Sequence, residues 1–577
     1  MNSHRVLIIA FFLVAGCAAP RPEMADPDIV ISVINTNDVH GELLPSEGRG
    51  GLATISGYAN ALRAAHAEND DEVLLIDAGD MWQGTLESNL GEGAAMVQAY
   101  NAMGYAAAAI GNHEFDFGPV GPDATPVNEQ QDARGNLKKR ATEARFPLLA
   151  SNLIDESTDQ LVDWDNVAPS VMLDVQGIKV GIVGAITKDA LRTTIAANTR
   201  GLRLAPLAET ISVEARKLRE QGATLVIVTA HAGSICTNFD NPRDLSSCDM
   251  DGEIIQVARA IPAGLVDQVI GGHVHEKIAH FVDGIAVTSA KSSTRAFGRV
   301  DYTLDRHTGA VIDRKIHPPA APCPWIVEDS GACTWSADAE GVVPARYEGR
   351  PVVPQPEVVA IGKEALARAS ELKEQKLGVF LETAITLEGN PESALGNLYT
   401  DALLASVDGD IAIHNVTGGI RADLPAGDLT FGSVYAMSPF DNRIVVIDMS
   451  GRQLRRIIEK QAHNHGRRAG FSGMRVDVSC NDEHMHIDMI RADGHVIEDD
   501  DRVHVIANDY LTMGGDDILT PKMTGAGYRY DDAHPFTRDA IVNWLRLRGG
   551  SLSADQFVHE NQRKWNLPDN LPASCRL

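Results

Sequence analysis

The stretch IVISVINTNDVH, residues 29–40, decides the fold of this chain, because a short apolar run ends there in the polar residues Asp38 and His40. Four more apolar runs end in the same manner, at Gly79-Asp80, at Gly111-Asn112-His113-Glu114, at His231 and at Gly271-Gly272-His273-Val274-His275. Short runs of Val, Ile, Leu and Ala that are closed by glycine-rich turns are typical of buried parallel strands. The pattern therefore predicts an α/β fold with ligand-type residues at the strand ends.

In an open α/β sheet, ligand groups gather beyond the carboxyl ends of the strands. We therefore expect seven side chains to converge in space: Asp38, His40, Asp80, Asn112, His231, His273 and His275. Carboxylate, amide and imidazole ligands without a thiolate suit two divalent ions such as Zn, Mn, Co or Fe. Two such ions can clamp an attacking hydroxide and a phosphoryl oxygen together.

The seven residues divide between two ions. Asp80 is the expected bridge, because a carboxylate can span both ions. The other ligands are assigned as Asp38, His40 and His275 to one ion and Asn112, His231 and His273 to the other.

His113 follows the expected ligand Asn112 directly, so its side chain is predicted to point toward the substrate. Asp116 lies three residues on, where its carboxylate can orient the ring and favour the protonated form. An imidazolium there would stabilise charge on the transferring phosphoryl group or on the leaving oxygen. The alternative is a histidine that caps the following helix.

These motifs, in this order, resemble the 5′-nucleotidase and UDP-sugar hydrolase family of calcineurin-like metallophosphoesterases. Four later motifs extend the resemblance over about residues 28 to 577: GNLYTDA at 396–402, GGIR at 418–421, FSGMR at 471–475 and MGGD at 513–516. The resemblance implies a four-layer metallophosphoesterase β-sandwich flanked by helices, then a linker helix and a C-terminal mixed α+β substrate-binding domain.

The resemblance also implies a nucleotide pocket. Phe440 and Tyr510 match two aromatic residues that clamp the base in the family, and Tyr510 stands where Phe is usual. Arg421 would engage phosphate or ribose, and Asp516 could bond the sugar hydroxyls.

Two positions depart from the family pattern. Val416 stands where an Asn is usual, and Pro391 stands where an Arg is usual. These departures could mean a shifted pocket or a different arginine reaching in.

The chain is acidic, with 51 basic against 79 acidic residues and a formal charge of −28. This charge argues against a nucleic acid polymer as a partner, because such partners need a basic surface. A small anionic substrate would still bind, since two dications dominate the local field.

The N-terminus has the layout of a secretory signal, with Arg5 before the apolar run Val6–Val14, which is too short to span a bilayer. Ala15-Gly16-Cys17 resembles a bacterial lipobox, which would make Cys17 a lipid anchor and the only membrane contact. Ordinary signal cleavage is the alternative. Either reading predicts an exported protein of the periplasm or cell surface.

Six cysteines remain beyond Cys17, an even number that suits an oxidising compartment. Sequence proximity favours the disulfides Cys236–Cys248 and Cys323–Cys333, which leaves Cys480–Cys575, although six cysteines allow fifteen pairings. A thiolate metal site is the competing interpretation, and no Cys-x-x-Cys motif supports it.

Changes in composition and in hydrophobic periodicity divide the chain into four predicted parts. These are a signal and tether at 1–27, the metallophosphoesterase domain at 28–350, a linker at 351–378 and the C-terminal domain at 379–577. Residues 307–356 are rich in Pro and Gly and are predicted to be loop-rich. The apolar spacing over 357–377 predicts a helix. Strands are predicted over 443–449, 474–478, 485–490 and 502–507.

We therefore expect an exported phosphohydrolase that releases phosphate from nucleotides by metal-hydroxide attack, with a nucleotide or nucleotide sugar as its small-molecule partner. UDP-sugar hydrolysis, 2′,3′-cyclic nucleotide phosphodiesterase activity and sulfur-ester hydrolysis are alternatives on the same fold. The aromatic pair disfavours the sulfur ester. A surface binding protein that has lost turnover is the alternative of another class.

Overall fold

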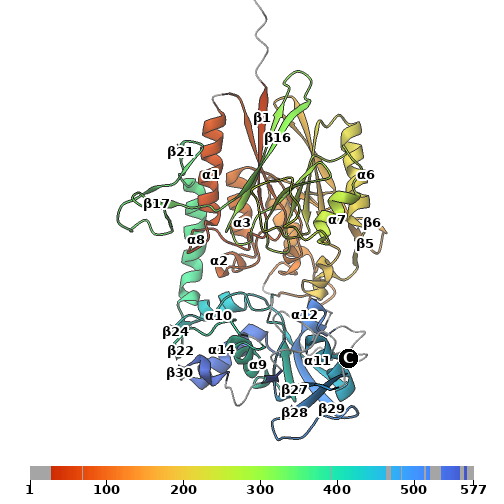
Figure 1. Ribbon diagram of the computed structural model, residues 1–577, viewed down its shortest axis with the longest axis vertical. Helices are drawn as coiled ribbons and strands as arrows, with labels where there is room; N and C mark the ends of the chain where they lie inside the picture. The colour runs from red at the N-terminus through yellow and green to blue at the C-terminus, as the bar shows by residue number, and fades with distance from the viewer. Residues whose placement is uncertain are drawn as a thin grey trace, which may run out of the picture.

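The computed structural model describes residues 28–67, 69–121, 123–389, 391–416, 418–462, 469–481, 484–512, 515–519, 534–558 and 564–567. Figure 1 shows two bodies, an N-terminal one built on β-sheets and helices and a smaller C-terminal one, with helix α8 running down one side of the N-terminal body to the C-terminal one.

The first sheet of the N-terminal body has seven strands in the order β16-β15-β1-β2-β3-β4-β7. Strands β1, β2, β3 and β4 are parallel to one another, so their carboxyl ends meet at one edge. The bounds are β16 Val311–Ala320, β15 Phe297–Leu304, β1 Ile29–Thr36, β2 Glu72–Asp77, β3 Tyr105–Ala109, β4 Leu148–Leu149 and β7 Val167–Ala168.

The second sheet has six strands in the order β13-β14-β12-β11-β9-β8. Strands β9, β11, β12 and β14 are parallel. The bounds are β13 Ile278–Val282, β14 Ile285–Ser289, β12 Gln268–Gly271, β11 Leu225–His231, β9 Ile178–Ile186 and β8 Ser170–Val175.

The two sheets pack face to face with helices on both outer sides. Because side chains alternate along a strand, Ile31 and Val33 of β1 join Ile182 and Ile227 in a core between the sheets. Ile34, on the opposite face of β1, packs under the outer helices. These are α1 Gly51–His66 and α3 Ala94–Met103 over the first sheet, and α6 Leu207–Glu220 and α7 Glu253–Ala260 over the second. The predicted four-layer α/β sandwich is confirmed.

Helix α8, Pro356–Lys373, joins the two bodies. It begins with Pro at the first helical position, where the missing N–H costs nothing. It ends four residues before the predicted end at 377, because Lys376–Leu381 forms strand β22. The helix packs on α1 and α3 of the N-terminal body, on the short α2 Leu86–Asn89, and on α10 Phe431–Met437 of the C-terminal body.

The C-terminal body is the predicted mixed α+β fold, with sheets in the orders β25-β29-β23-β26, β24-β22-β30 and β28-β27-β31. The four predicted strands are present as β25 Ile444–Ser450, β27 Met474–Asn481, β28 His484–Arg491 and β29 Arg502–Asn508. The other strands are β23 Ile411–His414, β24 Gly427–Thr430, β26 Gly470–Ser472, β30 Gly550–Leu552 and β31 Trp565–Asn566. The helices include α9 Ala394–Leu404, α10 Phe431–Met437, α11 Gly451–Ala462, α12 Asp509–Thr512 and α14 Thr537–Arg548.

The segment predicted to be loop-rich contains long strand β16 and then only strands of two or three residues. These are β17 Trp325–Val327, β18 Cys333–Thr334, β19 Val342–Pro344, β20 Arg346–Tyr347 and β21 Arg350–Pro351. The prediction missed β16, which pairs antiparallel with β15 at the sheet edge, with its two prolines, Pro318 and Pro319, at a shift in the register. An edge strand tolerates proline, because its outer N–H groups need no partner strand.

The structure contains two of the three predicted disulfides, Cys236–Cys248 and Cys323–Cys333. Cys480 is also disulfide-bonded, and its predicted partner Cys575 lies outside the described residues, as does Cys17. Among the described residues, no helix combines the length and apolar character needed to cross a bilayer.

Candidate metal centre and substrate cavity

All seven predicted ligands lie at or just beyond strand ends at one edge of the sandwich. Asp38 and His40 follow β1, Asp80 follows β2, and Asn112 follows β3. His231 is the last residue of β11, and His273 and His275 follow β12. The first sheet thus supplies four of these side chains and the second sheet three, so the site lies across the sandwich.

The ligand-type side chains fall into two groups. In the first, His275 Nε2 lies 3.1 Å from His40 Nε2 and 3.3 Å from Asp38 Oδ1. In the second, His231 Nε2 lies 3.1 Å from Asp80 Oδ2.

Asn112 joins the second group. Its Oδ1 lies 3.0 Å from His231 Nε2 and 3.1 Å from His273 Nδ1. Each group therefore brings at least three donor atoms close enough to hold one cation.

Five of these residues have a left-handed backbone: Asp38, His40, Asp80, His273 and His275, with φ between 48 and 75°. Side chains other than Gly pay about 1 kcal/mol or more for this region. Such a cost is retained where the surrounding structure fixes it, and clusters of it mark ligand clamps.

The electrostatics of the second group fit a cation. Burial would raise the pKa of the Asp80 carboxyl, but the rings of His231 and His113 outweigh burial and hold it well below its usual value. Burial would lower the pKa of His231, but Asp80 outweighs it and raises this pKa to about 10. Burial and then His231 lower the pKa of His273 to about 4. The site therefore holds a buried carboxylate charge that a divalent ion can balance in place of a proton.

Backbone carbonyls orient the ligand rings. His40 Nδ1 lies 2.8 Å from the oxygen of Gln83, and His231 Nδ1 lies 2.7 Å from the oxygen of Ala78. In each case the bond fixes the tautomer and turns Nε2 toward the site, as is usual for metal-binding histidines.

Glu114 supports the Asp80 turn, a role that the sequence analysis missed. Its buried carboxylate accepts from the backbone N–H of Gly111 at 2.6 Å, of Asp80 at 2.9 Å and of Met81 at 2.8 Å. Burial and the Asp80 charge raise the pKa of Glu114 to about 8 against these bonds. The sequence contained one sign of this role, because Glu114 lies only two residues after the expected ligand Asn112.

His113 and Asp116 form the predicted pair, with Nδ1 of the ring 2.7 Å from Oδ2 of the carboxylate. Thr194 donates to the other oxygen of Asp116 at 2.7 Å. Burial would lower the pKa of His113, but Asp116 and Asp80 outweigh it and raise this pKa. Since Nδ1 is held by Asp116, Nε2 is the ring atom left for a substrate.

A cavity of about 830 Å³ lies between the two bodies and contains the metal-side residues at one end. The four predicted substrate residues, Arg421, Phe440, Tyr510 and Asp516, line the same cavity. A volume of this size suits a nucleotide-sized ligand.

The two ends of the cavity are in contact. Arg421 Nη2 lies 3.4 Å from His40 Nε2, and the Phe440 ring stacks on the His113 ring with centroids 5.5 Å apart. Two of the predicted substrate residues of the C-terminal body, Arg421 and Phe440, therefore lie directly beside the predicted metal-side residues.

The two departures from the family pattern lie outside this cavity. Val416 and Pro391 line a separate, much smaller cavity in the C-terminal body. Asn415, one position before the expected Asn, lines the main cavity instead and donates through Nδ2 to Asp516 Oδ2. Tyr510 donates to the other oxygen of Asp516 at 2.9 Å. An amide side chain one residue before Val416 thus reaches the main cavity, which spacing alone did not reveal.

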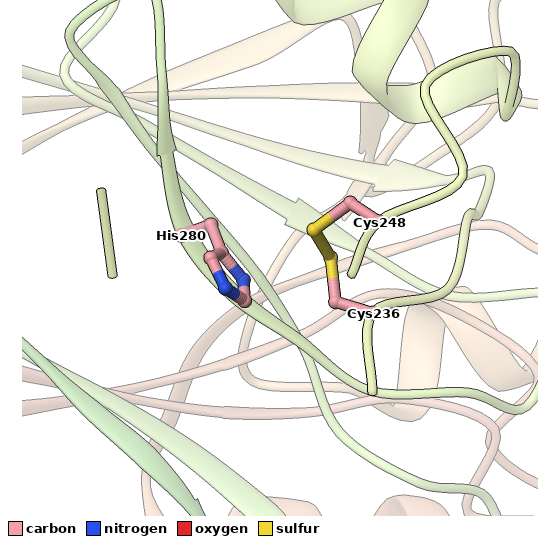
Figure 2. Close-up of side chains that lie close together, drawn as sticks. All are labelled: Cys236, Cys248 and His280. Atoms are coloured by element: carbon pink, nitrogen blue, oxygen red, sulfur yellow. A yellow bond between two sulfur atoms is a disulfide. The ribbon is translucent and has the colours of Figure 1, made fainter. Parts of the chain in front are cut away.

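A third group of metal-type side chains, Cys236, Cys248 and His280, has its ligand atoms within 4.8 Å of one another. Figure 2 shows that the two sulfurs are bonded to each other as a disulfide, with the His280 ring beside them. A disulfide offers no thiolate for a metal. This group therefore acts as a cross-link of the loop between β11 and α7.

The layered fold and the two His/Asp groups at its strand ends define a metal-dependent phosphoesterase. Residues 371–523 match the family described as 5′-nucleotidase, C-terminal domain. This part of the chain is therefore a 5′-nucleotidase C-terminal domain, and it follows an N-terminal body with a metallophosphoesterase fold.

Individual relatives and a solved structure are similar to this chain over most of its length. A 5′-nucleotidase from Vibrio cholerae serotype O1 is 24% identical over 500 residues, which cover 81% of this chain and 82% of the relative. A cell wall protein from Listeria monocytogenes is 25% identical over 576 residues, which cover 89% of this chain and 68% of the relative. The crystal structure of a 5′-nucleotidase precursor from Thermus thermophilus has the same fold, with a TM-score of 0.69 at 21% identity, covering 94% of this chain and 100% of that one.

Proposed function

We propose that this chain is an exported hydrolase that releases phosphate from nucleotides. The observation that carries the proposal is the shared cavity, in which the paired His/Asp groups face Arg421 and Phe440 of the C-terminal body. A phosphoryl group at the His/Asp end and a base at the aromatic end would fill it together.

The residues at the metal end would have two roles, to hold the metal ions and to donate a hydrogen bond to the substrate. Asp38, His40 and His275 would hold one divalent ion, Asn112, His231 and His273 the other, and Asp80 would bridge them. Such ions supply Lewis-acid neutralisation of phosphoryl charge. Asp116 holds the His113 ring and favours its protonated form. The ring would then donate a hydrogen bond from Nε2 to the phosphoryl oxygen or to the leaving oxygen.

The residues at the other end would select a nucleoside. Phe440 and Tyr510 would stack on the base, because aromatic faces bind flat rings with little loss of conformational freedom. Asp516, held by Asn415 and Tyr510, would accept hydrogen bonds from ribose hydroxyls. Arg421 would bind phosphate or ribose from the C-terminal side.

The test is phosphate release by the signal-free protein after metal removal and resupply of Mn or Zn. The substrates are AMP, ADP, UDP-glucose, 2′,3′-cyclic AMP and p-nitrophenyl phosphate. We expect metal-restored turnover of a nucleotide, and we expect Asp80→Ala to lower kcat/KM about 1,000-fold or more.

The matched control is Asp251→Ala, which removes an exposed carboxylate from the same body. Metal content by mass spectrometry gives a second readout. Bound metal with no turnover of any nucleotide would overturn the proposal and favour a binding protein that keeps the fold.

We further propose that the protein is exported and anchored through Cys17. Two disulfides in the described residues support an oxidising compartment, as does the cell wall relative. Cys17→Ala should move the protein from the membrane fraction to the soluble fraction in its bacterial host. Mass spectrometry of the mature N-terminus should find a lipid on Cys17, and an unmodified N-terminus at another residue would exclude the anchor.

A further inference from the structure

Cys236, Cys248 and His280 form a cluster of metal-type side chains beside the second sheet, outside the lining of the main cavity. One ligand atom from each of them lies within 4.8 Å of the other two. Figure 2 shows the His280 ring beside the disulfide that joins the two sulfurs. The disulfide gives the two cysteines a role, but it leaves the histidine without one.

His280 occupies a core position that an apolar side chain would fill. It lies on strand β13 between Ile278 and Val282, which share its face because side chains alternate along a strand. Both of these residues belong to the same apolar cluster as Cys236. His280 is fully buried, and its Nε2 has no hydrogen-bond partner in the part of the chain that the structure describes. Since a buried polar atom without a partner is unfavourable, its presence here is the feature expected of a ligand atom.

The His280 ring is in the form that binds a metal ion. Burial lowers the pKa of His280, while a backbone hydrogen bond with Asn238 and the charge of Asp244 oppose this effect. The backbone nitrogen of Ala279 lies 3.4 Å from Nδ1, so this contact leaves Nε2 free. The Phe239 ring lies beside the imidazole, with centroids 5.7 Å apart. A neutral imidazole in such an apolar environment is a good ligand for a divalent cation.

Backbone hydrogen bonds hold the two cysteines in place without the sulfur–sulfur bond. Cys236 and Cys248 form an antiparallel bridge, flanked by two backbone hydrogen bonds of 3.2 and 2.8 Å between the same segments. The Cys236 N–H also donates to the carbonyl oxygen of Lys277 at 3.0 Å, and the Phe281 N–H donates to that of Pro242 at 2.7 Å. These bonds tie the loop to β13, so both sulfurs would stay beside the imidazole after reduction.

The loop that carries the two cysteines packs against the turn that carries the predicted ligand His273. A Cβ added at Gly233 would lie 2.4 Å from the carbonyl oxygen of Gly272 and 2.4 Å from a methyl group of Val274. The Gly272 N–H donates to the carbonyl oxygen of Ala232 at 2.9 Å. A cross-link within this loop therefore supports one wall of the metal end.

We propose that Cys236, Cys248 and His280 form a redox-gated site for a thiophilic divalent cation, of which Zn²⁺ is the simplest example. In the oxidised protein the disulfide cross-links the loop, and in the reduced protein the cation does so in its place. Two thiolates and one imidazole are an established ligand set for zinc, with a water molecule in the fourth position. This inference does not depend on the proposed function, because it concerns a different site.

The exchange of the disulfide for a cation is balanced in two steps. A two-electron reductant, a dithiol in the cell, gives each sulfur one electron and one proton and itself closes to a disulfide. The cation then displaces the two thiol protons, which pass to water, and accepts a lone pair from His280. Cys248 is half-buried, so the reductant and the cation can reach the sulfurs from its side.

The experiment measures bound zinc in the signal-free protein, in its oxidised form and after reduction. The reductant is a phosphine, which becomes a phosphine oxide with an oxygen from water and adds no competing thiol. Reduced wild type should bind about one Zn²⁺ per chain more than oxidised wild type. Cys236→Ser with Cys248→Ser should show no gain on reduction. The matched control, Cys323→Ser with Cys333→Ser, removes another disulfide and should keep the gain.

Co²⁺ in place of Zn²⁺ gives a readout that is specific for thiolate ligands. Reduced wild type should show charge-transfer absorption between thiolate and cobalt, which the two His/Asp groups cannot give because they contain no sulfur. His280→Leu keeps an apolar side chain in the core but removes the ligand nitrogen. It should weaken Zn²⁺ binding at this site at least about 10- to 100-fold, since loss of a residue that only supports a ligand already costs that much.

Three outcomes would overturn the inference. These are no gain of bound zinc when the wild type is reduced, a gain that persists in Cys236→Ser with Cys248→Ser, and unchanged affinity in His280→Leu. If His280→Leu does not fold, the zinc content and the cobalt absorption of oxidised and reduced wild type decide the question. The two proposals fail separately, because zinc binding at the cysteines is measured without any substrate and phosphate release is measured in the oxidised protein.

Discussion

The two ends of the main cavity are built in different ways. At the metal end, each ligand-type residue ends or follows a buried strand, and five of them sit in left-handed turns held by nearby backbone bonds. At the opposite end, which is proposed to bind the nucleoside and is called the nucleoside end below, the side chains come from loops and short helices of the C-terminal body. They depend on one another, as Asn415 and Tyr510 do in holding Asp516. The metal end is thus fixed by local backbone geometry, and the nucleoside end by side-chain contacts between distant segments. Substrate choice can therefore change while the metal end stays the same.

The largest effect on kcat/KM should come from a substitution that adds a methyl group beside the predicted metal ligands. A Cβ added at Gly111 would lie 2.2 Å from Asp80 Oδ1, so Gly111→Ala must displace that carboxylate or its turn. We expect kcat/KM to fall about 100-fold or more on every substrate, nucleotide or aryl phosphate, with loss of bound metal. Steady-state kinetics and metal analysis measure both.

Gly91→Ala is the control, because the nearest atom to a Cβ there lies 3.8 Å away. A Gly111→Ala enzyme that retains activity on p-nitrophenyl phosphate but loses nucleotides would contradict the division between the two ends.

The same difference between the two ends of the cavity explains which site residues could be predicted from the sequence. The seven ligand-type residues were predicted because each adjoins an apolar run, so their position follows from strand periodicity and from the rule that parallel strands end at one edge. Glu114 was missed because its role depends on three backbone donors that meet only in the folded turn. Asn415 was missed for the same reason. It lies outside any motif, and its hydrogen bond to Asp516 joins two residues that are far apart in the chain.

The next effect concerns His113. Asp116→Asn removes the charge that outweighs burial, so the pKa of His113 should fall. A raised histidine pKa keeps the imidazolium present until the pH rises through that pKa, so activity that needs the charged ring is lost on the alkaline side. In Asp116→Asn this alkaline loss should begin at lower pH, and kcat/KM near neutral pH should drop about 10- to 100-fold. A pH profile of kcat/KM measures the shift.

Thr194→Val offers a graded comparison, because Thr194 donates to the other oxygen of Asp116 and its replacement leaves the Asp116 charge in place. It should lower the rate by less than Asp116→Asn does. An unchanged alkaline limb in Asp116→Asn would remove His113 from the role of charged donor.

A smaller effect is expected at the nucleoside end. Phe440→Ala with Tyr510→Ala should raise KM for nucleotides about 10- to 100-fold, because two aromatic faces are lost. Turnover of p-nitrophenyl phosphate should be nearly retained, since that substrate needs only the metal end. Equal losses on both substrates would show that the rings support the catalytic end instead, through the stack of Phe440 on His113.

The smallest effect tests the asparagine that lies one residue from its expected position. Asn415→Ala removes the amide that holds Asp516, so KM for nucleotides should rise about three- to tenfold while kcat changes little, because the lost bond orients a binding group. Val416→Ala is the matched control, since Val416 lines the separate small cavity. Measuring KM for AMP in both variants decides between the two positions. If Val416→Ala raises KM more than Asn415→Ala does, the small cavity contributes to nucleotide binding and the nucleoside end extends deeper into the C-terminal body than the contacts of Asp516 indicate.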